Sequence, residues 1–212
     1  MPITAENWNV QVIGFWNRAI YTPAGISRRL FQLPQNIPVQ VFIPLDFPAP
    51  YQVQHEGLTV IVGGDRLIVQ PDRANFEGIA AAMEIGRRAL DDLPRTPFIA
   101  AGFNLRYQSD GMVPSLDEIV GNAWDNRLSD EGLAILERTV TRAVRRQSGR
   151  INVTLTQKED LTFSLLLNFD LQSDDVAQLR AWIDGDAANI RHEVERILYN
   201  TLGFQATEVI YG

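Results

Sequence analysis

The clearest alternation of apolar and polar positions lies between residues 149 and 172. Apolar residues take every second position from Ile151 to Leu155, and again from Leu161 to Phe169. A period of two with one apolar side predicts two half-buried antiparallel strands, joined by a turn at 157–160. From residue 174 the apolar residues follow helical spacing, which predicts a long helix over 174–202. The stretch is therefore expected to form a hairpin with a helix packed on it.

The first half of the chain shows the same kinds of pattern. Alternation predicts strands over 8–16, 38–45, 52–63 and 66–70, and Gly63-Gly64-Asp65 supplies the residues that a tight turn needs. A short helix is expected over 24–31, and Asn75 is expected to cap a long helix that runs to about Leu93. Prolines at 94 and 97 then mark the best candidate boundary in the chain.

After this boundary a strand is expected over 98–108 and a short helix over 115–124. The segment 130–147 is ambiguous. Its apolar residues Leu133, Leu136, Val140 and Val144 have helical spacing, whereas Thr139, Thr141 and several arginines suit an exposed strand. Spacing alone favours a helix.

The two halves list their elements in the same order if 130–147 contains a strand, with a period of about 90–100 residues. The expected fold class is therefore α+β. Two pseudo-repeated β-α-β-β-β-α lobes, residues 1–95 and 96–212, would form one mostly antiparallel sheet with two long helices packed on one face. We expect the lobes to share one continuous domain.

Two short runs, Phe15 to Pro23 and Leu167-Asn-Phe-Asp170, resemble a sporadically distributed group of bacterial proteins of unknown function. The resemblance implies a bacterial or phage origin and a two-lobed, strand-rich fold. It brings no catalytic residues with it.

Composition removes several classes of function. The net charge of −7 argues against general nucleic-acid binding, which needs a basic face. The chain has no cysteine and only two histidines, so thiol chemistry, disulfides and a multi-histidine metal site are not expected. No cofactor is expected either. The start of the chain lacks the features of a signal peptide, and no apolar run approaches the roughly 18 residues of a membrane span. A cytoplasmic protein without a membrane segment is expected.

Acidic and basic clusters are the next candidates for a chemical role. Carboxylate pairs at 91/92, 174/175 and 184/186 could in principle perform acid–base work, but acids at helix ends are usually solvated or offset the helix dipole. Arginine doublets at 28/29, 87/88 and 145/146 usually pair with nearby carboxylates in an acidic protein. Neither pattern points to a catalytic residue.

The most informative surface signal is a pair of similar runs, at 16–18 and 124–127, near the ends of expected elements. Tryptophan, amide and guanidinium groups are enriched at protein interfaces, although a tryptophan more often simply closes a core. The candidate interaction residues are Trp16, Asn17, Arg18, Trp124, Asn126 and Arg127.

Three functions remain, in this order. The first is a non-catalytic protein-interaction or adaptor protein of a bacterial or phage system, with self-association as one form of it. The second is a small-ligand-binding module, with a groove between the two long helices near Ala81, Ala82 and Gly86. The third is a carboxylate-dependent hydrolase, which needs two acids in one cleft.

Overall fold

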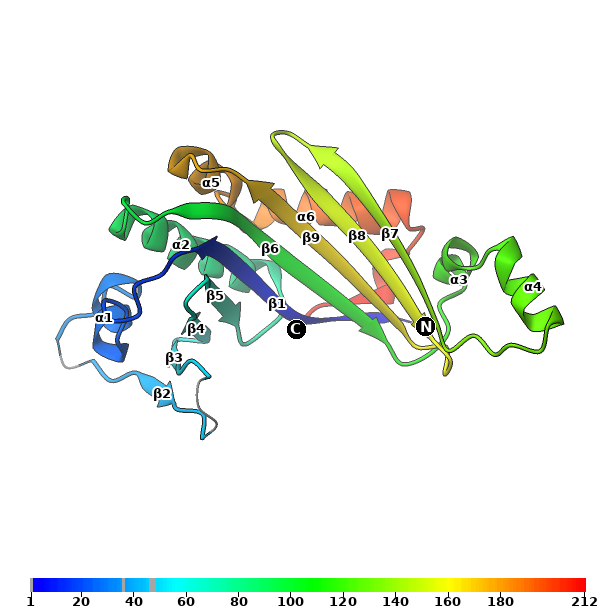
Figure 1. Cartoon of the computed structure of the whole chain (residues 1–212), viewed down its shortest axis with the longest axis horizontal. Coiled ribbons are helices and arrows are strands. Elements are labelled where there is room, and N and C mark those ends of the chain that lie inside the picture. Colours follow the sequence, from blue (N-terminus) through cyan, green and yellow to red (C-terminus); the bar gives the residue numbers. More distant parts are fainter. Residues whose placement is uncertain (1, 36, 46–48) are drawn as a thin grey trace.

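A computed structural model describes residues 2–35, 37–45 and 49–212. Its centre is one ten-stranded sheet, with the strand order β2-β3-β4-β5-β1-β6-β9-β8-β7 and β10 beside β1 (Figure 1). The strands are β1 (Ile3–Gly14), β2 (Gln40–Phe42), β3 (Gln52–His55), β4 (Leu58–Val62), β5 (Arg66–Pro71), β6 (Phe98–Ser109), β7 (Glu137–Arg146), β8 (Gly149–Lys158), β9 (Phe163–Gln172) and β10 (Val209–Ile210).

Helices connect and cover these strands. They are α1 (Pro23–Arg29), α2 (Phe76–Asp92), α3 (Pro114–Val120), α4 (Ala123–Asp130), α5 (Val176–Trp182) and α6 (Ala187–Glu195). A π-helical turn, η1 (Arg196–Thr201), continues α6, and a short 3-10 turn, η2 (Ala206–Glu208), precedes β10. The fold is therefore a mixed one, with helices and one large antiparallel sheet, and this coarse part of the expected class is confirmed.

The two halves of the chain meet at the antiparallel pair β1 and β6, in which Val10 lies opposite Phe103. The neighbouring strands along the main path pair antiparallel, and β10 joins β1 in the parallel sense. Moving outward from the centre, the order is β1-β5-β4-β3-β2 in one half and β6-β9-β8-β7 in the other. A duplication of lobes 1–95 and 96–212 stays a prediction, because the first half has one strand more on this path than the second.

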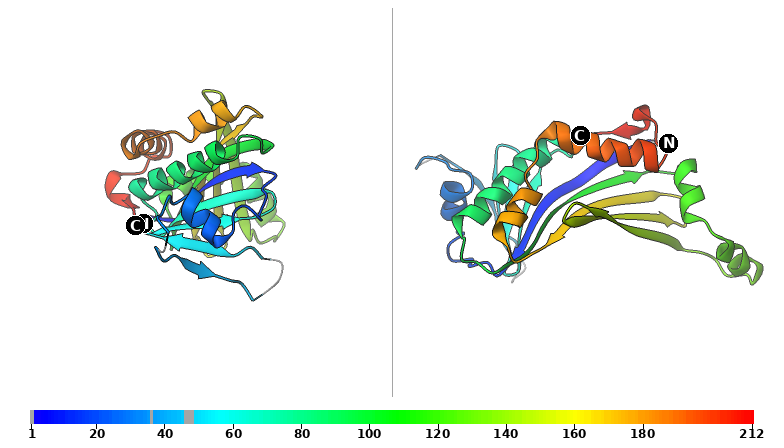
Figure 2. Two further views of the ribbon diagram at one scale, coloured as in Figure 1. Left: turned by 90° about the vertical axis from the view of Figure 1, so that its left-hand side faces the viewer. Right: turned by 90° about the horizontal axis from the view of Figure 1, so that it is seen from above.

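Figure 2 shows α2, α5 and α6 along the same side of the sheet. α2 contacts β5 and β1, and it also contacts α6. A Cβ atom placed on Gly86 of α2 would lie 3.1 Å from Cδ1 of Ile183 and 3.2 Å from Cγ1 of Val10. The small residue at this position therefore allows close packing of helix against helix and strand.

The core lies between this helical layer and the sheet. Along β9, Phe163, Leu165, Leu167 and Phe169 are buried, as the alternation predicts. Phe169 stacks on Phe103 of β6 with ring centroids 4.2 Å apart. Each such side chain contributes roughly 1.5–3 kcal/mol by leaving water, whereas an exposed ion pair contributes less than about 1 kcal/mol. The apolar faces therefore dominate the stability of this arrangement.

Leu161 was expected on the buried face of this strand and is not there. It lies in the turn before β9 with φ of 62°, and its side chain is 43% exposed. The hairpin turn is longer than the alternation indicates, because Leu161 N–H bonds back to the Lys158 carbonyl at 2.9 Å.

Segment 130–147, which the sequence leaves open between a helix and a strand, contains a strand. Helical spacing favoured a helix there, but α4 ends at Asp130 and β7 covers Glu137–Arg146. Val140 and Val144 lie on one side of this strand, opposite Leu155 and Ile151 of β8. Apolar residues four positions apart, such as Val140 and Val144, lie on one face of a helix and also on one face of a strand. This spacing therefore does not decide between the two.

Three further elements are split where one was expected. The strand over 52–63 is the hairpin of β3 and β4, which turns at Glu56 and Gly57, both with positive φ. The helix over 174–202 is α5, α6 and η1, with a break at 183–186. The short helix expected over 115–124 likewise divides into α3 and α4, separated by Gly121 and Asn122.

Candidate protein-interaction surface

The structure separates the two runs that were expected to mark an interface. The first follows β1 and leads into α1, and the second lies in α4. Helices α1 and α4 lie at opposite ends of the long axis of the molecule (Figure 1). The two runs therefore do not form one site.

Trp16 is a core residue. Its side chain is 5% exposed, its ring packs edge-on against Phe98 at 5.2 Å, and its Nε1–H donates to the Val12 carbonyl at 3.1 Å. Asn17 and Arg18 are exposed, and Asn17 Oδ1 accepts a hydrogen bond from the Ala19 amide at 3.1 Å. The alternative interpretation of this run, in which the tryptophan belongs to the hydrophobic core, fits these contacts better.

The second run is exposed. Trp124 of α4 is 66% exposed, Asn126 and Arg127 are also exposed, and none of the described residues of α4 is buried. The chain that follows carries Leu133, 56% exposed, and Leu136, 66% exposed. We call residues 121–136 the α4 arm, and Figure 1 shows its helix extending beyond the end of β7 and β8. More than half of the surface of Trp124, Leu133 and Leu136 therefore faces solvent.

The base of the α4 arm is fixed to the sheet. Arg138 of β7 donates from Nε to Oδ2 of Asp125 at 2.6 Å and from Nη1 to Oε1 of Gln157 at 2.8 Å. Gln157, which is 1% exposed, donates in turn to Oδ1 of Asp117 in α3 at 2.8 Å. Asn122 also caps α4 by accepting from the Trp124 amide at 2.8 Å. The helix is therefore held at its start, while its outer face is left to solvent.

Next to the α4 arm, a groove of about 1020 Å³ lies between the outer strands and the last helix. Half-buried and exposed apolar residues of β7 and β8 form its floor, Ile197 and Leu202 form one wall, and Ile119 of α3 closes the end nearest the arm. Arg142, Arg146 and Arg196 line it as well. The groove therefore combines an apolar floor with a basic rim.

The face of the sheet opposite the helices carries a row of asparagines. Asn152 donates to Asn168 at 2.7 Å, Asn168 to Asn104 at 2.8 Å, and Asn104 to Asn9 at 3.0 Å. This amide ladder crosses β8, β9, β6 and β1, and its side chains are half-buried. It joins the two halves of the sheet by side-chain hydrogen bonds.

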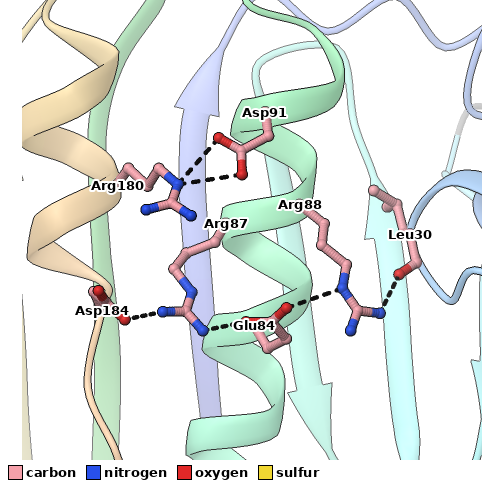
Figure 3. A network of polar contacts seen from close by, with 7 residues as sticks. All are labelled: Leu30, Glu84, Arg87, Arg88, Asp91, Arg180 and Asp184. Carbon is pink, nitrogen blue, oxygen red and sulfur yellow. Dashed lines mark hydrogen bonds and ion pairs between the residues drawn. The ribbon is translucent and has the colours of Figure 1, made fainter.

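Several of the acids in the candidate carboxylate pairs form ion pairs with arginines. Figure 3 shows Arg87 of α2 bridging Glu84 and Asp184, and Arg180 of α5 contacting both carboxylate oxygens of Asp91 at 3.1 and 3.2 Å. Arg88 bonds Glu84 at 3.1 Å and donates to the Leu30 carbonyl at 3.0 Å. These contacts tie α2 to α5 and to the end of α1, so they stabilise the helical layer.

Of the four remaining acids of those pairs, three have structural partners, and Asp174 is exposed. Asp92 accepts from Arg29 at 2.9 Å and from the Tyr21 hydroxyl at 3.2 Å. Asp175 and Asp186 cap α5 and α6 through the Ala177 and Asn189 amides. The described part of the chain contains no group of three acidic or histidine side chains placed to hold a metal ion. None of its helices is long and apolar enough to cross a membrane.

Sequence reasoning missed the groove and the amide ladder. Both arise from strand register, which brings Val144 beside Ile151 and Asn104 beside Asn168. The signal that could have found the ladder is an asparagine at the polar position of four separate strands. No protein-family model, curated protein or solved structure matches the chain.

Proposed function

We propose that this chain is a non-catalytic protein-interaction or adaptor protein of a bacterial or phage system, and that it holds its partner through the α4 arm. The observation that carries the proposal is the exposure of Trp124, Leu133 and Leu136 on an arm whose base is fixed by the Arg138 contacts. Large apolar side chains grouped on a surface are typical of interaction sites, and tryptophan is enriched among residues that dominate binding energy.

The two other functions have less support. A ligand groove between the long helices would need free space near Gly86, where Ile183 and Val10 pack closely. A hydrolase would need two acids facing one reacting centre, whereas Asp91, Asp92 and Asp184 each face an arginine. The acidic net charge also disfavours general nucleic-acid binding.

The proposal extends to the setting and the history of the chain. The lack of cysteine fits a reducing cytoplasm. In each half the first strand lies at the centre and later strands lie outward in reverse chain order, which supports a pseudo-repeat of lobes 1–95 and 96–212, although the first half has one strand more on this path. The resemblance of residues 15–23 and 167–170 to the bacterial group supports a bacterial or phage origin.

Site-specific photo-crosslinking in cells of the native host tests the proposal. The photoreactive residue p-benzoylphenylalanine replaces Trp124 or Leu133 in the α4 arm, and Phe15 serves as the matched control because it is an aromatic residue that is 71% exposed elsewhere. We expect the same protein adduct from both arm positions and not from Phe15. An arm that yields no adduct, or one shared with Phe15, would overturn the proposal.

A further inference from the structure

The groove beside the α4 arm exists because the helical layer does not fully cover the outer strands. Val140 and Val153 on its floor are only half-buried, and Val144 is 47% exposed, although all three lie on the face of the sheet that carries the helices. Ile197 of η1 and Ile119 of α3 line the same groove. Covering an apolar surface of this kind with another element removes it from water and lowers the free energy.

The charge of the groove restricts what can cover it. Arg146 pairs with Glu193 at 2.6 Å and lies over the Trp182 ring at 4.6 Å, so its charge is balanced within the chain. Arg142 on β7 and Arg196 on η1 have no ion pair with any residue in the described ranges, although the chain as a whole carries −7. The groove is therefore complementary to an apolar element with acidic flanks.

The α4 arm of the same chain has those properties. Trp124 and Leu128 are four residues apart and so share one face of the helix. Asp130 and Glu131 follow at its end, are exposed, and have no ion pair with the residues that the structure describes. Because Trp124 is 66% exposed, the arm does not fill the groove of its own chain.

We infer that the partner of the α4 arm is a second copy of this chain, and that each arm lies in the groove of the other copy. Such a contact is reciprocal, as a two-fold dimer requires, because each copy contributes one arm and one groove. Trp124 would cover the floor around Val144, and Asp130 and Glu131 would approach Arg142 and Arg196. The inference rests on the proposed function and names the partner for the same surface.

Two reciprocal charge reversals test this contact. The groove variant is Arg142→Glu/Arg196→Glu, and the arm variant is Asp130→Arg/Glu131→Arg. Light scattering after size exclusion should give the full-length protein twice the 23.8 kDa of one chain. Each variant alone should be monomeric, with a dissociation constant raised at least about tenfold, because like charges then meet at both contacts.

An equimolar mixture of the two variants provides the decisive measurement. In a mixed pair, the reversed groove meets the reversed arm and the native groove meets the native arm, so both contacts are again attractive. The mixture should therefore dimerise although neither variant does so alone. A misfolded variant could not restore the dimer. The double variant Arg28→Glu/Arg95→Glu, which changes two exposed arginines elsewhere by the same charge, should remain dimeric.

Three results would overturn the inference: a native chain that stays monomeric, a dimer that survives either reversal, or a mixture that stays monomeric. A photo-adduct of the α4 arm that contains only a different protein would also overturn it and would leave the proposed function standing. Absence of any arm adduct would instead remove the proposed function.

Discussion

Arg138 of β7 and Asp125 of α4 lie 13 residues apart in the chain, and their side chains meet at 2.6 Å. Asp125 lies in the first turn of α4 and Arg138 in the strand that follows the α4 arm. Because α4 buries none of its described side chains, its position depends on this pair and on the Asn122 cap. The pair is thus the main link between the arm and the sheet.

We expect Asp125→Ala to free the α4 helix while the sheet stays folded. The change removes a charge-assisted hydrogen bond of about 1.5–3 kcal/mol and one half of the capping box. Hydrogen exchange should show faster exchange of the α4 amides, with exchange in β8 and β9 unchanged. Ser129→Ala, which changes an exposed side chain near the other end of the same helix, should leave exchange in α4 nearly as it is. Equal protection of α4 in both variants would contradict the anchoring role of Asp125.

Gly102 of β6 is predicted to be sensitive to the smallest substitution. A Cβ atom there would lie 2.1 Å from the Phe169 carbonyl oxygen of β9, a backbone atom in the middle of the sheet. Gly102→Ala should therefore lower the free energy of unfolding by about 2–3 kcal/mol, because β6 and β9 must move apart. Urea denaturation measures the effect.

Gly64→Ala is the matched control for this change. No atom lies within 4 Å of a Cβ at Gly64, so its midpoint in urea should change little. Equal midpoints for the two variants would mean that β6 and β9 are not as close as the structure shows.

The sequence predicts those elements in which one short-range pattern decides the outcome. The alternation in β8 and β9 is clear within each strand, because Ile151 and Leu155 of β8 and every second residue from Phe163 to Phe169 of β9 are buried on one face. The α2 helix begins after Asn75, as expected, because the side chain of Asn75 accepts from the Gly78 amide at 2.8 Å. Local periodicity and local capping hydrogen bonds can both be predicted from the sequence.

The candidate site depends on information that local patterns do not contain. Trp16 and Trp124 have similar neighbours in sequence, yet one is buried and the other is exposed. The difference arises because two residues pack around Trp16. Tyr21 reaches it across a turn, and Phe98 comes from a distant part of the chain. No element among the described residues covers α4 in the same way. The pairing of β7 with β8 decides where the groove forms.

Buried tyrosines should make the protein sensitive to alkaline pH. Burial raises the pKa of Tyr107 well above 10, and it raises the pKa of Tyr21 and Tyr211 in the same direction. The folded chain then keeps these protons at a pH where the unfolded chain loses them. Stability is therefore full below about pH 10 and falls as the pH rises above it, by about 1.4 kcal/mol per pH unit for each such tyrosine.

Tyr107→Phe isolates one contribution to this fall. The Tyr107 hydroxyl is buried and makes no hydrogen bond to a described residue, so its removal should cost less than about 1 kcal/mol at pH 8. Between pH 10 and 11, urea midpoints of the variant should fall less steeply than those of the native chain. Parallel pH profiles would show that Tyr107 ionises as readily in the folded chain as in the unfolded one.

The amide ladder should contribute to the joining of the two halves of the sheet. Asn104 both donates to Asn9 and accepts from Asn168, so Asn104→Asp keeps the acceptor and loses the donor. An ionised carboxylate would face the Asn9 oxygen, and we expect a loss of about 1–3 kcal/mol at pH 7. Protonation would restore a donor, so the deficit relative to the native chain should shrink as the pH falls toward 4.

Gln108→Glu tests whether charge on this face explains the result. Gln108 lies on the same strand and the same face as Asn104, four residues away, and its side chain is exposed. The same exchange of amide for carboxylate should change stability by less than about 0.5 kcal/mol there, because exposed substitutions away from special contacts are usually within this range. A deficit in the Asn104 variant that did not shrink with acid would mean that the lost donor is not its cause.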